Sequence, residues 1–292
     1  MHIYKKFKEI KMRRRLSILL VLTILAATIL GGCSSTNAEV DSATNQEGSS
    51  VFKIGLEAGY PPFNWTQMDD SNGAVPIDGT KEFAGGYDVE IAKIIAEGLG
   101  KELVVVKTEW DGLLPALTSG MIDGIIAGMS PTAERAEQID FSDVYYTSNF
   151  VMVVKKGGSY ENAKSIQDFS GAKITAQLNT SNYRAIDQIN GVIKETAMDN
   201  FPAMRVALES GIIDGYVAEK PEAISATSAN PNLAFVEFEE GFVVPIEDTS
   251  VAVGLKKNSE LTEKVNEILS GISQEEREQL IEDAIKNQPA AQ

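Results

Sequence analysis

Histidine and cysteine are almost missing from this sequence of 292 residues, which has one of each, His2 and Cys33. A zinc site built from histidine and cysteine needs about four such ligands. Serine hydrolysis by a Ser-His-Asp triad needs an imidazole. The sequence therefore excludes both kinds of site, and we predict a protein with no catalytic residue, no metal and no cofactor.

Positive charge is scarce beyond the N-terminus. The whole chain carries a net charge of −16. Seven Lys or Arg residues and Glu9 lie before Cys33, so that segment holds +6 and the remainder holds −22. A strongly acidic body disfavours nucleic acid and anionic lipid headgroups as partners. We predict no nucleic-acid partner, and contact with a bilayer only through an anchor.

Long apolar runs are limited to Leu16–Leu30, which follows a basic segment and spans 15 residues. A bilayer-spanning helix needs roughly 20 residues. A basic region, a short apolar run and small residues are typical of an export signal. We predict that residues 1–32 are a signal peptide and that the protein acts on the outer face of the cell membrane.

Cys33 follows Leu30-Gly31-Gly32, which resembles the lipobox of bacterial lipoproteins, although Gly31 stands where Ala or Ser is more usual. We predict an acyl chain (palmitate) on Cys33. The alternative is an ordinary signal peptide beside a buried thiol. Residues 33–50 have no apolar periodicity and are predicted to form, after the lipidated cysteine, a flexible tether.

From Val51 onward, short apolar strands alternate with helices, which predicts an α/β fold with mainly parallel strands. A helix is expected from Asp88 to a stop at Gly100, and a second helix is expected with Asp111 as its cap, Pro115 in its first turn and Gly120 as its end. Further strands are expected over 51–55, 103–106, 122–127, 173–177, 212–218, 233–238 and 251–255, and further helices over 182–189, 201–209, 221–227, 261–269 and 275–285.

An internal repeat predicts two lobes. ALTSGMIDGIIA, over 116–127, and ALESGIIDGYVA, over 207–218, agree at eight of twelve positions. Each copy is the end of a helix, a glycine and a buried strand. We predict a first lobe over 51–148, a second lobe over 149–254 and a return to the first lobe over 255–292, with crossovers near 150–156 and 249–257.

Ligands of open α/β sheets bind beyond the carboxyl ends of the strands. After the first repeat come Gly128, Met129 and Ser130-Pro131, which is typical of a helix start and an anion seat, and Arg135 lies one turn further. The second repeat ends at Glu219, which suits an ammonium group. Alternatively, Arg135 is a solvated arginine and Glu219 a helix cap. Further candidates follow three other strands: Tyr60 and Phe63 after the first strand, Trp110 after the strand over 103–106, and Thr180 and Ser181 at a helix start after the strand over 173–177.

The segments FKIGLEAGYPPFNW, GGYDVEIAKIIAEGLG, WDGLLPALTSGMIDGIIAGMSPTAERAEQIDFSDVYY and IIDGYVAEKPEA resemble bacterial extracellular solute-binding proteins of family 3, the polar amino-acid receptors of ABC importers. The resemblance implies a two-lobed, type II periplasmic-binding fold hinged by two crossover strands. It also implies that Arg135, aided by Ser130, the Gly128 region, Thr180 and Ser181, holds the ligand carboxylate. Glu219 would take the ammonium, Tyr60 and Trp110 would enclose the side chain, and Glu57 would meet a side-chain donor or cation.

The resemblance leaves two points open. Asn179 stands where relatives usually have glycine, and the Met68–Ala84 loop is longer than in the shortest members of the family, which leaves open whether it reaches over the pocket and affects ligand selectivity. Function is also open between two classes. We predict a monomeric amino-acid receptor that delivers its ligand to a membrane permease, with arginine or another cationic amino acid favoured and glutamine next. The alternative is an exported dehydratase-like enzyme of the same fold that acts on cyclic carboxylic acids.

Overall fold

The first lobe is built on a mixed five-stranded sheet. The computed structural model describes residues 50–289, so the predicted signal peptide, Cys33 and the tether up to residue 49 lie outside the described residues. The strand order is β6-β1-β7-β14-β8; β6 and β7 run parallel to β1, and β14 runs antiparallel to β7 and β8. The strands are β1 (Val51–Leu56), β6 (Glu102–Lys107), β7 (Gly124–Ile125), β8 (Asp140–Thr147) and β14 (Ser250–Leu255).

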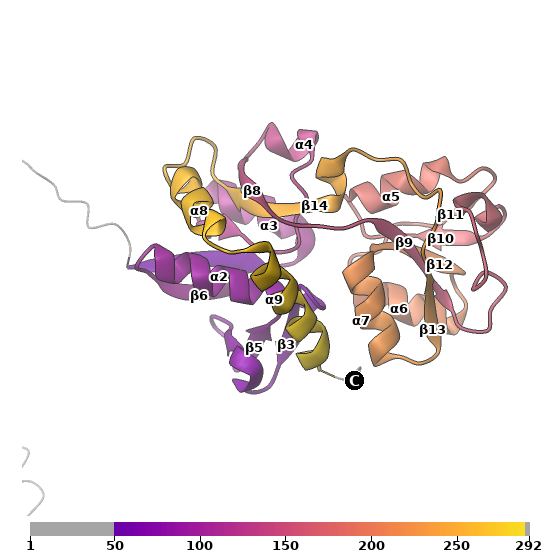
Figure 1. Cartoon of the computed structure of the whole chain (residues 1–292), viewed down its shortest axis with the longest axis horizontal. Helices are drawn as coiled ribbons and strands as arrows, with labels where there is room; N and C mark the ends of the chain where they lie inside the picture. Colours follow the sequence, from indigo (N-terminus) through magenta and orange to yellow (C-terminus); the bar gives the residue numbers. More distant parts are fainter. Residues whose placement is uncertain (1–49, 290–292) are drawn as a thin grey trace, which may run out of the picture. The chain divides into compact units, whose positions relative to one another are not determined.

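The second lobe repeats this arrangement. Its strand order is β11-β10-β12-β9-β13, with β11 and β12 parallel to β10 and with β9 antiparallel to β12 and β13. Figure 1 shows the two sheets as separate lobes. The strands are β9 (Phe150–Lys155), β10 (Lys173–Thr175), β11 (Ile193–Lys194), β12 (Gly215–Glu219) and β13 (Leu233–Val236).

Helices accompany both sheets. The first lobe contains α2 (Tyr87–Gly98), α3 (Trp110–Ser119), α4 (Ala133–Ala136), α8 (Leu261–Ser270) and α9 (Gln274–Asn287). The second lobe contains α5 (Ser181–Ala185), α6 (Phe201–Ser210) and α7 (Lys220–Ala229). Short 3-10 turns cover Ser71–Gly73 (η1), Ile166–Phe169 (η2), Ile186–Gln188 (η3) and Ile246–Thr249 (η4). Among residues 50–289, none of the helices has the length and apolar character that a membrane crossing requires.

The repeated segments take the same structure in both lobes. Gly120 ends α3 and Gly211 ends α6, each in the left-handed conformation, with φ of 83° and 78°. Asp123 then accepts a hydrogen bond from the backbone N–H of Lys53, and Asp214 accepts one from Lys173, both at 2.9 Å. The strand that follows, β7 or β12, lies at the centre of its sheet. The repeat therefore marks one structural unit used twice, as predicted.

Residues 59–85, which include the Met68–Ala84 loop, form a small four-stranded antiparallel sheet that was not predicted. Its order is β2-β3-β5-β4. The strands are two to four residues long, too short for an alternating pattern to be visible. They are β2 (Gly59–Tyr60), β3 (Asn64–Gln67), β4 (Val75–Pro76) and β5 (Phe83–Gly85).

Gly86 joins this small sheet to α2 through a close backbone contact. Its φ is 124°, and a Cβ at this position would lie 2.4 Å from the carbonyl oxygen of Phe63. The first two N–H groups of α2, those of Tyr87 and Asp88, donate to the carbonyls of Pro62 and Phe63 at 3.0 and 2.8 Å. The start of α2 therefore fixes the backbone that carries the aromatic residues of the site.

The chain passes between the sheets twice. It leaves the first sheet after Thr147 and enters the second at Phe150, and it returns just before Ser250. The two crossings lie side by side, since Ser148 N–H donates to the carbonyl of Thr249 at 2.9 Å. The return comes earlier than the predicted boundary after residue 254, because β14 pairs with β7 and β8 of the first sheet.

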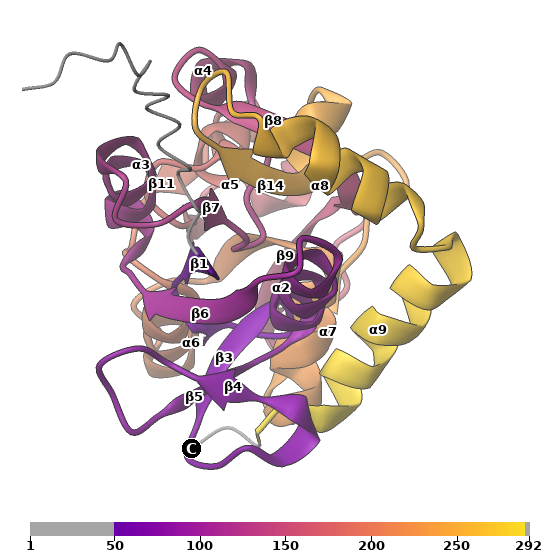
Figure 2. The same cartoon turned by 90° about the vertical axis from the view of Figure 1, so that its left-hand side faces the viewer.

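The C-terminal helix touches both lobes. Figure 2 shows α9 running from α8 towards the small sheet, and it packs on α2. Just after α9, the side-chain amide of Gln288 donates to the carbonyl of Ser225 in α7 at 3.2 Å and accepts from the Ser225 hydroxyl. The end of the first-lobe helix is thus hydrogen-bonded to the second lobe.

Two local predictions in the first lobe were wrong. The second helix begins at Trp110, before Asp111, so Pro115 lies in its second turn and cannot donate the usual bond to the carbonyl of Asp111. Asp111 does not cap this helix, and its carboxylate instead accepts from Asn179 of the second lobe at 2.9 Å. The strand expected over 122–127 pairs as β7 only at Gly124–Ile125.

Candidate functional site

The carboxyl ends of β7 and β12 lead into one small cavity between the lobes. Its volume is about 20 Å³, room for about one water molecule. Eight of the eleven predicted site residues line it: Tyr60, Trp110, Gly128, Ser130, Arg135, Thr180, Ser181 and Glu219. Three further residues that were not predicted also line it, namely Gln177, Asn182 and Phe201. The residues come from both lobes, so the cavity exists only when the lobes are together.

Glu219 ends β12 and is 8% exposed. Its carboxylate accepts hydrogen bonds from the Tyr60 hydroxyl of the first lobe and from the Asn182 side-chain amide, the latter at 3.0 Å. These two donors orient the Glu219 carboxylate at the cavity wall, and the side chain does not cap a helix.

Arg135 is tied to both lobes. Its guanidinium donates to the backbone carbonyl of Ser130 at 2.9 Å and to that of Asn179, across the lobes, at 3.0 Å. It also lies over the ring of Trp110, 5.0 Å from the ring centroid. Burial lowers the pKa of Arg135 to about 10, so the side chain remains a cation at neutral pH. A guanidinium has five N–H donors, so donors remain for an anionic ligand.

Ser130 does not begin a helix, contrary to the prediction. α4 begins at Ala133, and its cap is Thr132, whose hydroxyl accepts from the backbone N–H of Arg135. The hydroxyl of Ser130 instead donates to the carbonyl of Asp248, and Ser181 of the second lobe donates to the same carbonyl at 3.2 Å. Asp248 lies in η4, on the returning crossover, so one carbonyl there joins a serine from each lobe.

The predicted helix start at Thr180 and Ser181 is present. Thr180 caps α5, and its hydroxyl accepts from the backbone N–H of Tyr183 at 3.3 Å. Asn179, which precedes it, has a φ of 56°. Asparagine adopts this left-handed conformation more readily than most residues. The departure from the usual glycine therefore leaves the turn intact.

Phe63 and Met129 do not line the cavity, although both were predicted site residues. Each is fully buried. Phe63 lies behind Tyr60, with ring centroids 4.9 Å apart, and so supports the aromatic wall without forming it. Met129 packs in the first-lobe core, and its carbonyl accepts from the backbone N–H of Ala252.

Glu57, also a predicted site residue, does not line the cavity but is hydrogen-bonded to Gln177, which does. Its carboxylate accepts from the side-chain amide of Gln177, across the lobes, at 3.0 Å. The pKa of Glu57 is raised to about 7, mainly by burial and also by the charges of Glu109 and Asp111, and the bond from Gln177 opposes this rise. Three acidic side chains, Glu57, Glu109 and Asp111, therefore lie near one another in this part of the site, and a bound cation would balance their negative charge.

A buried carboxylate, that of Asp88 in α2, supports the first-lobe side of the cavity. It accepts from the Asn64 amide at 2.8 Å and from the Tyr145 hydroxyl at 2.7 Å, and it also accepts from the backbone N–H of Gly128. Burial raises the pKa of Asp88 to about 6, and these bonds hold it lower than burial alone would. Gly128 has a φ of 61°, and a Cβ there would lie 2.6 Å from the Tyr60 ring. Asp88 therefore fixes the strand end that contacts Tyr60.

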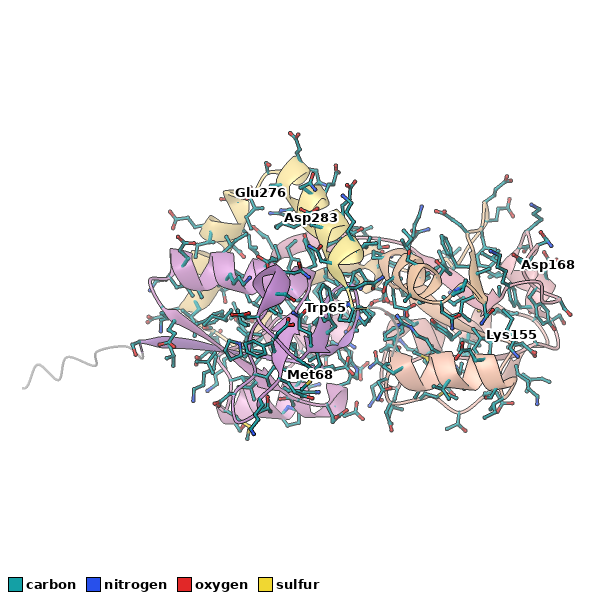
Figure 3. The ribbon with its side chains drawn as sticks, turned by 90° about the horizontal axis from the view of Figure 1, so that it is seen from below. Trp65, Met68, Lys155, Asp168, Glu276 and Asp283 are labelled. Carbon is teal, nitrogen blue, oxygen red and sulfur yellow. The ribbon has the colours of Figure 1, made fainter. Side chains whose placement is uncertain are left out.

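The Met68–Ala84 loop does not reach the cavity. It contains η1 and β4 and pairs with the small sheet, in which Gly85 lies against the ring of Trp65. Figure 3 shows Trp65 and Met68 on the first lobe. Met68 is exposed and lines a separate groove with Val206 of α6. The loop therefore lies beside the cleft and not over the residues that line the cavity.

Within residues 50–289, no group of three or more His, Cys, Asp or Glu side chains is placed to hold a metal ion. The cavity instead combines one guanidinium, one oriented carboxylate, several hydroxyl and amide groups, and aromatic rings. Such a set can hold a small zwitterion by charge-assisted hydrogen bonds.

Comparison with known families and proteins agrees with this description. The model of the family described as bacterial extracellular solute-binding proteins, family 3, matches residues 52–285. The arginine-binding extracellular protein ArtP of Bacillus subtilis is 30% identical over 269 residues, which cover 85% of this chain and 90% of that protein.

Two solved structures are similar over most of the chain. One is an amino-acid ABC transporter substrate-binding protein, AbpA, from Streptococcus pneumoniae, bound to L-arginine; it has a TM-score of 0.69 and 29% identity, over 81% of this chain and 95% of that chain. The other is an ancestral arginine-binding protein bound to glutamine, with a TM-score of 0.67 and 32% identity, over 80% of this chain and 97% of that chain. These likenesses confirm the predicted α/β class and the two-lobed periplasmic-binding fold.

Proposed function

The chain belongs to the bacterial extracellular solute-binding proteins, family 3, and we propose that it is the substrate-binding lipoprotein of an ABC amino-acid importer. The ligand is a polar L-amino acid, with arginine or another cationic amino acid first and glutamine next. The protein acts as a monomer and delivers the ligand unchanged to a membrane permease. A relative named for arginine, and similar structures bound to L-arginine and to glutamine, support this ligand class.

One observation carries the proposal: a guanidinium and an oriented carboxylate line the same small cavity from opposite lobes. Arg135 of the first lobe suits a ligand carboxylate, and Glu219 of the second lobe suits a ligand ammonium. A free amino acid presents both groups on one carbon atom. Binding such a ligand would therefore join the lobes through two charge pairs.

Lobe movement is part of the proposed function. The cavity has room for about one water molecule, so an amino acid enters only after the lobes separate. Hydrogen bonds that cross between the lobes are then broken, among them those from Tyr60 to Glu219, from Gln177 to Glu57, from Arg135 to the carbonyl of Asn179 and from Asn179 to Asp111. The ligand replaces part of this set when the lobes close again.

The preference for a cationic side chain rests on Glu57. Ionised Glu57 is disfavoured by burial and by its acidic neighbours Glu109 and Asp111. A guanidinium beside it would favour the ionised form and lower its pKa. Arginine binding should therefore release a proton from Glu57, whereas binding of the neutral glutamine side chain should not.

We expect the affinity for arginine to fall by about tenfold from pH 8 to pH 6, because Glu57, with a pKa of about 7, must ionise to pair with the cation. The affinity for glutamine should change little over this range. Replacing Glu57 by Gln keeps the shape and removes the charge, so it should weaken arginine more than glutamine and remove the pH step. Isothermal titration calorimetry with both ligands, at two pH values and two salt concentrations, measures these effects.

Asp70→Asn, at an exposed position on the first lobe, serves as the control and should reproduce the wild-type pH step. A wild-type preference for glutamine, or an equal loss of both ligands in Glu57→Gln, would contradict the cationic assignment while leaving an amino-acid receptor. Turnover of a prephenate-like acid by the purified protein would contradict the binding role itself.

The proposal places the protein on the outer face of the membrane through an acyl chain on Cys33. We expect Cys33→Ala to be released into the medium or retained with its leader, because one acyl-bearing residue is the whole anchor. Mass spectrometry of the mature N-terminus and membrane fractionation measure this, with Ser35→Ala as the control that keeps the cysteine. An unmodified or differently cleaved wild-type N-terminus would remove the lipoprotein assignment.

A further inference from the structure

Both faces of the Tyr60 ring are covered, and the two covering rings come from different lobes. Phe63 of the first lobe stacks on one face. Phe201, the first residue of α6 in the second lobe (Figure 1), stacks on the other face, with ring centroids 4.4 Å apart and an interplanar angle of 13°. A ligand that stacks on Tyr60 must therefore enter between Tyr60 and Phe201.

Phe201 is held firmly in this position. Asn200 caps α6, and its side-chain oxygen accepts from the backbone N–H of Ala203 at 3.0 Å. The edge of Phe201 packs against the buried ring of Tyr216, with centroids 6.3 Å apart. The side chain is 3% exposed and lines the cavity. Phe201 therefore forms a fixed aromatic wall on the second-lobe side of the cavity.

The stacked pair is connected to both carboxylates of the site. The Tyr60 hydroxyl donates to Glu219, where the ligand ammonium is proposed to bind. Gln177 donates to Glu57 and also to the carbonyl of Asp199, two residues before Phe201, each at 3.0 Å. A side chain that extends from the Glu219 end towards Glu57 would therefore run along these two rings.

Trp110, the other predicted aromatic wall, already has a cation over its ring. The Arg135 guanidinium lies 5.0 Å from the Trp110 centroid and is fixed there by its bonds to two backbone carbonyls. Trp110 therefore supports the group that binds the ligand carboxylate. Phe201 is the ring that faces Tyr60 across the lobes.

We propose that Phe201 and Tyr60 form an aromatic clamp across the lobes that selects a planar cationic side chain, the guanidinium of arginine, over the ammonium of lysine. This inference rests on the proposed amino-acid binding and assigns its selectivity to a residue of the second lobe. A guanidinium is flat and weakly hydrated, so it stacks on aromatic faces on both of its sides. An ammonium is compact and strongly hydrated, and it loses more on entering a space between two rings.

Lysine and arginine carry the same charge, so comparing them isolates the shape of the cation. We expect wild-type protein to bind arginine more tightly than lysine. Phe201→Leu should weaken arginine by about tenfold and lysine by less than about threefold, since a desolvated cation–π contact is lost only for the stacked ligand. Phe201→Trp keeps an aromatic face and should retain the preference. Calorimetry with both ligands on the three proteins measures these values.

Phe238→Leu, in the separate core of the second lobe, is the control for a general loss of packing and should leave the ratio of the two affinities unchanged. Thermal unfolding of each variant shows whether it is folded, and Phe201→Trp gives a second variant if the leucine variant is not. Equal losses of arginine and lysine in Phe201→Leu, or a wild-type protein that binds both equally, would overturn the clamp alone. A wild-type protein that binds no amino acid would overturn the proposed function and the clamp together.

Discussion

Replacing Arg135 by Ala is expected to weaken binding of the amino acid by about 30-fold or more. Removing one member of a buried charge pair costs about 2–5 kcal/mol, because the other member is left without its partner. In this case the ligand carboxylate would be left in a nearly closed cavity. Arg135 already makes its bonds to Ser130 and Asn179 and its contact with Trp110 without ligand, so the lost pairing with the ligand carboxylate sets the size of the effect.

Arg135→Lys separates charge from geometry. Lysine keeps the positive charge but cannot present a planar fork to two carbonyls and a carboxylate, so its affinity should lie between those of the wild type and Arg135→Ala. Arg184→Ala is the matched control. Arg184 is about half exposed, and its contacts with Glu134 and Asp248 are 3.9 and 3.8 Å long, so its removal should change the affinity by less than about fivefold. If calorimetry finds wild-type affinity in Arg135→Ala, the ligand carboxylate binds at another place.

Replacing Glu219 by Gln is expected to have a similar effect, a loss of about 30-fold or more, because the ligand ammonium then lacks its countercharge. The amide also fits its neighbours poorly. Glu219 accepts from both Tyr60 and Asn182, whereas glutamine has only one acceptor oxygen and places an NH₂ group against one of these donors.

An exposed glutamate of the same lobe provides the comparison for Glu219→Gln. Glu237 pairs with Lys220 at 2.8 Å, and both side chains are more than one third exposed, so Glu237→Gln should bind like the wild type. Equal calorimetric affinities for the wild type and Glu219→Gln would show that the ammonium binds elsewhere. Unchanged thermal unfolding of the free Glu219→Gln protein would assign the effect to the ligand.

The two-lobed architecture could be predicted because both lobes carry the same sequence pattern. The helix end, the glycine stop and the central strand appear in both lobes, and Gly120 and Gly211 both take the left-handed conformation that such a stop requires. The rule that ligands bind at the carboxyl ends of strands then placed Arg135 and Glu219 at one cavity. Gln177 follows the same rule, since it comes just after β10, and could have been found in this way.

Phe201 and Asn182 could not be found from local patterns. Phe201 begins a helix with an apolar face, and only the arrangement of the two lobes places it on Tyr60. The sequence also could not show which of Tyr60 and Phe63 lines the cavity, because both flank the same proline pair. Pairing of β2 with β3 places Tyr60 in a strand opposite Asn64 and leaves Phe63 in the turn, from which it packs into the core.

The hydrogen bonds that join the two lobes also limit the rate at which a ligand can bind. The bonds from Tyr60 to Glu219 and from Gln177 to Glu57 occupy groups that the ligand would use, so the closed protein competes with its own ligand. The apparent affinity equals the affinity of the open form multiplied by the fraction of the protein that is open. Entry is then gated: at high concentrations of the amino acid, the observed association rate should stop rising and equal the rate at which the lobes open.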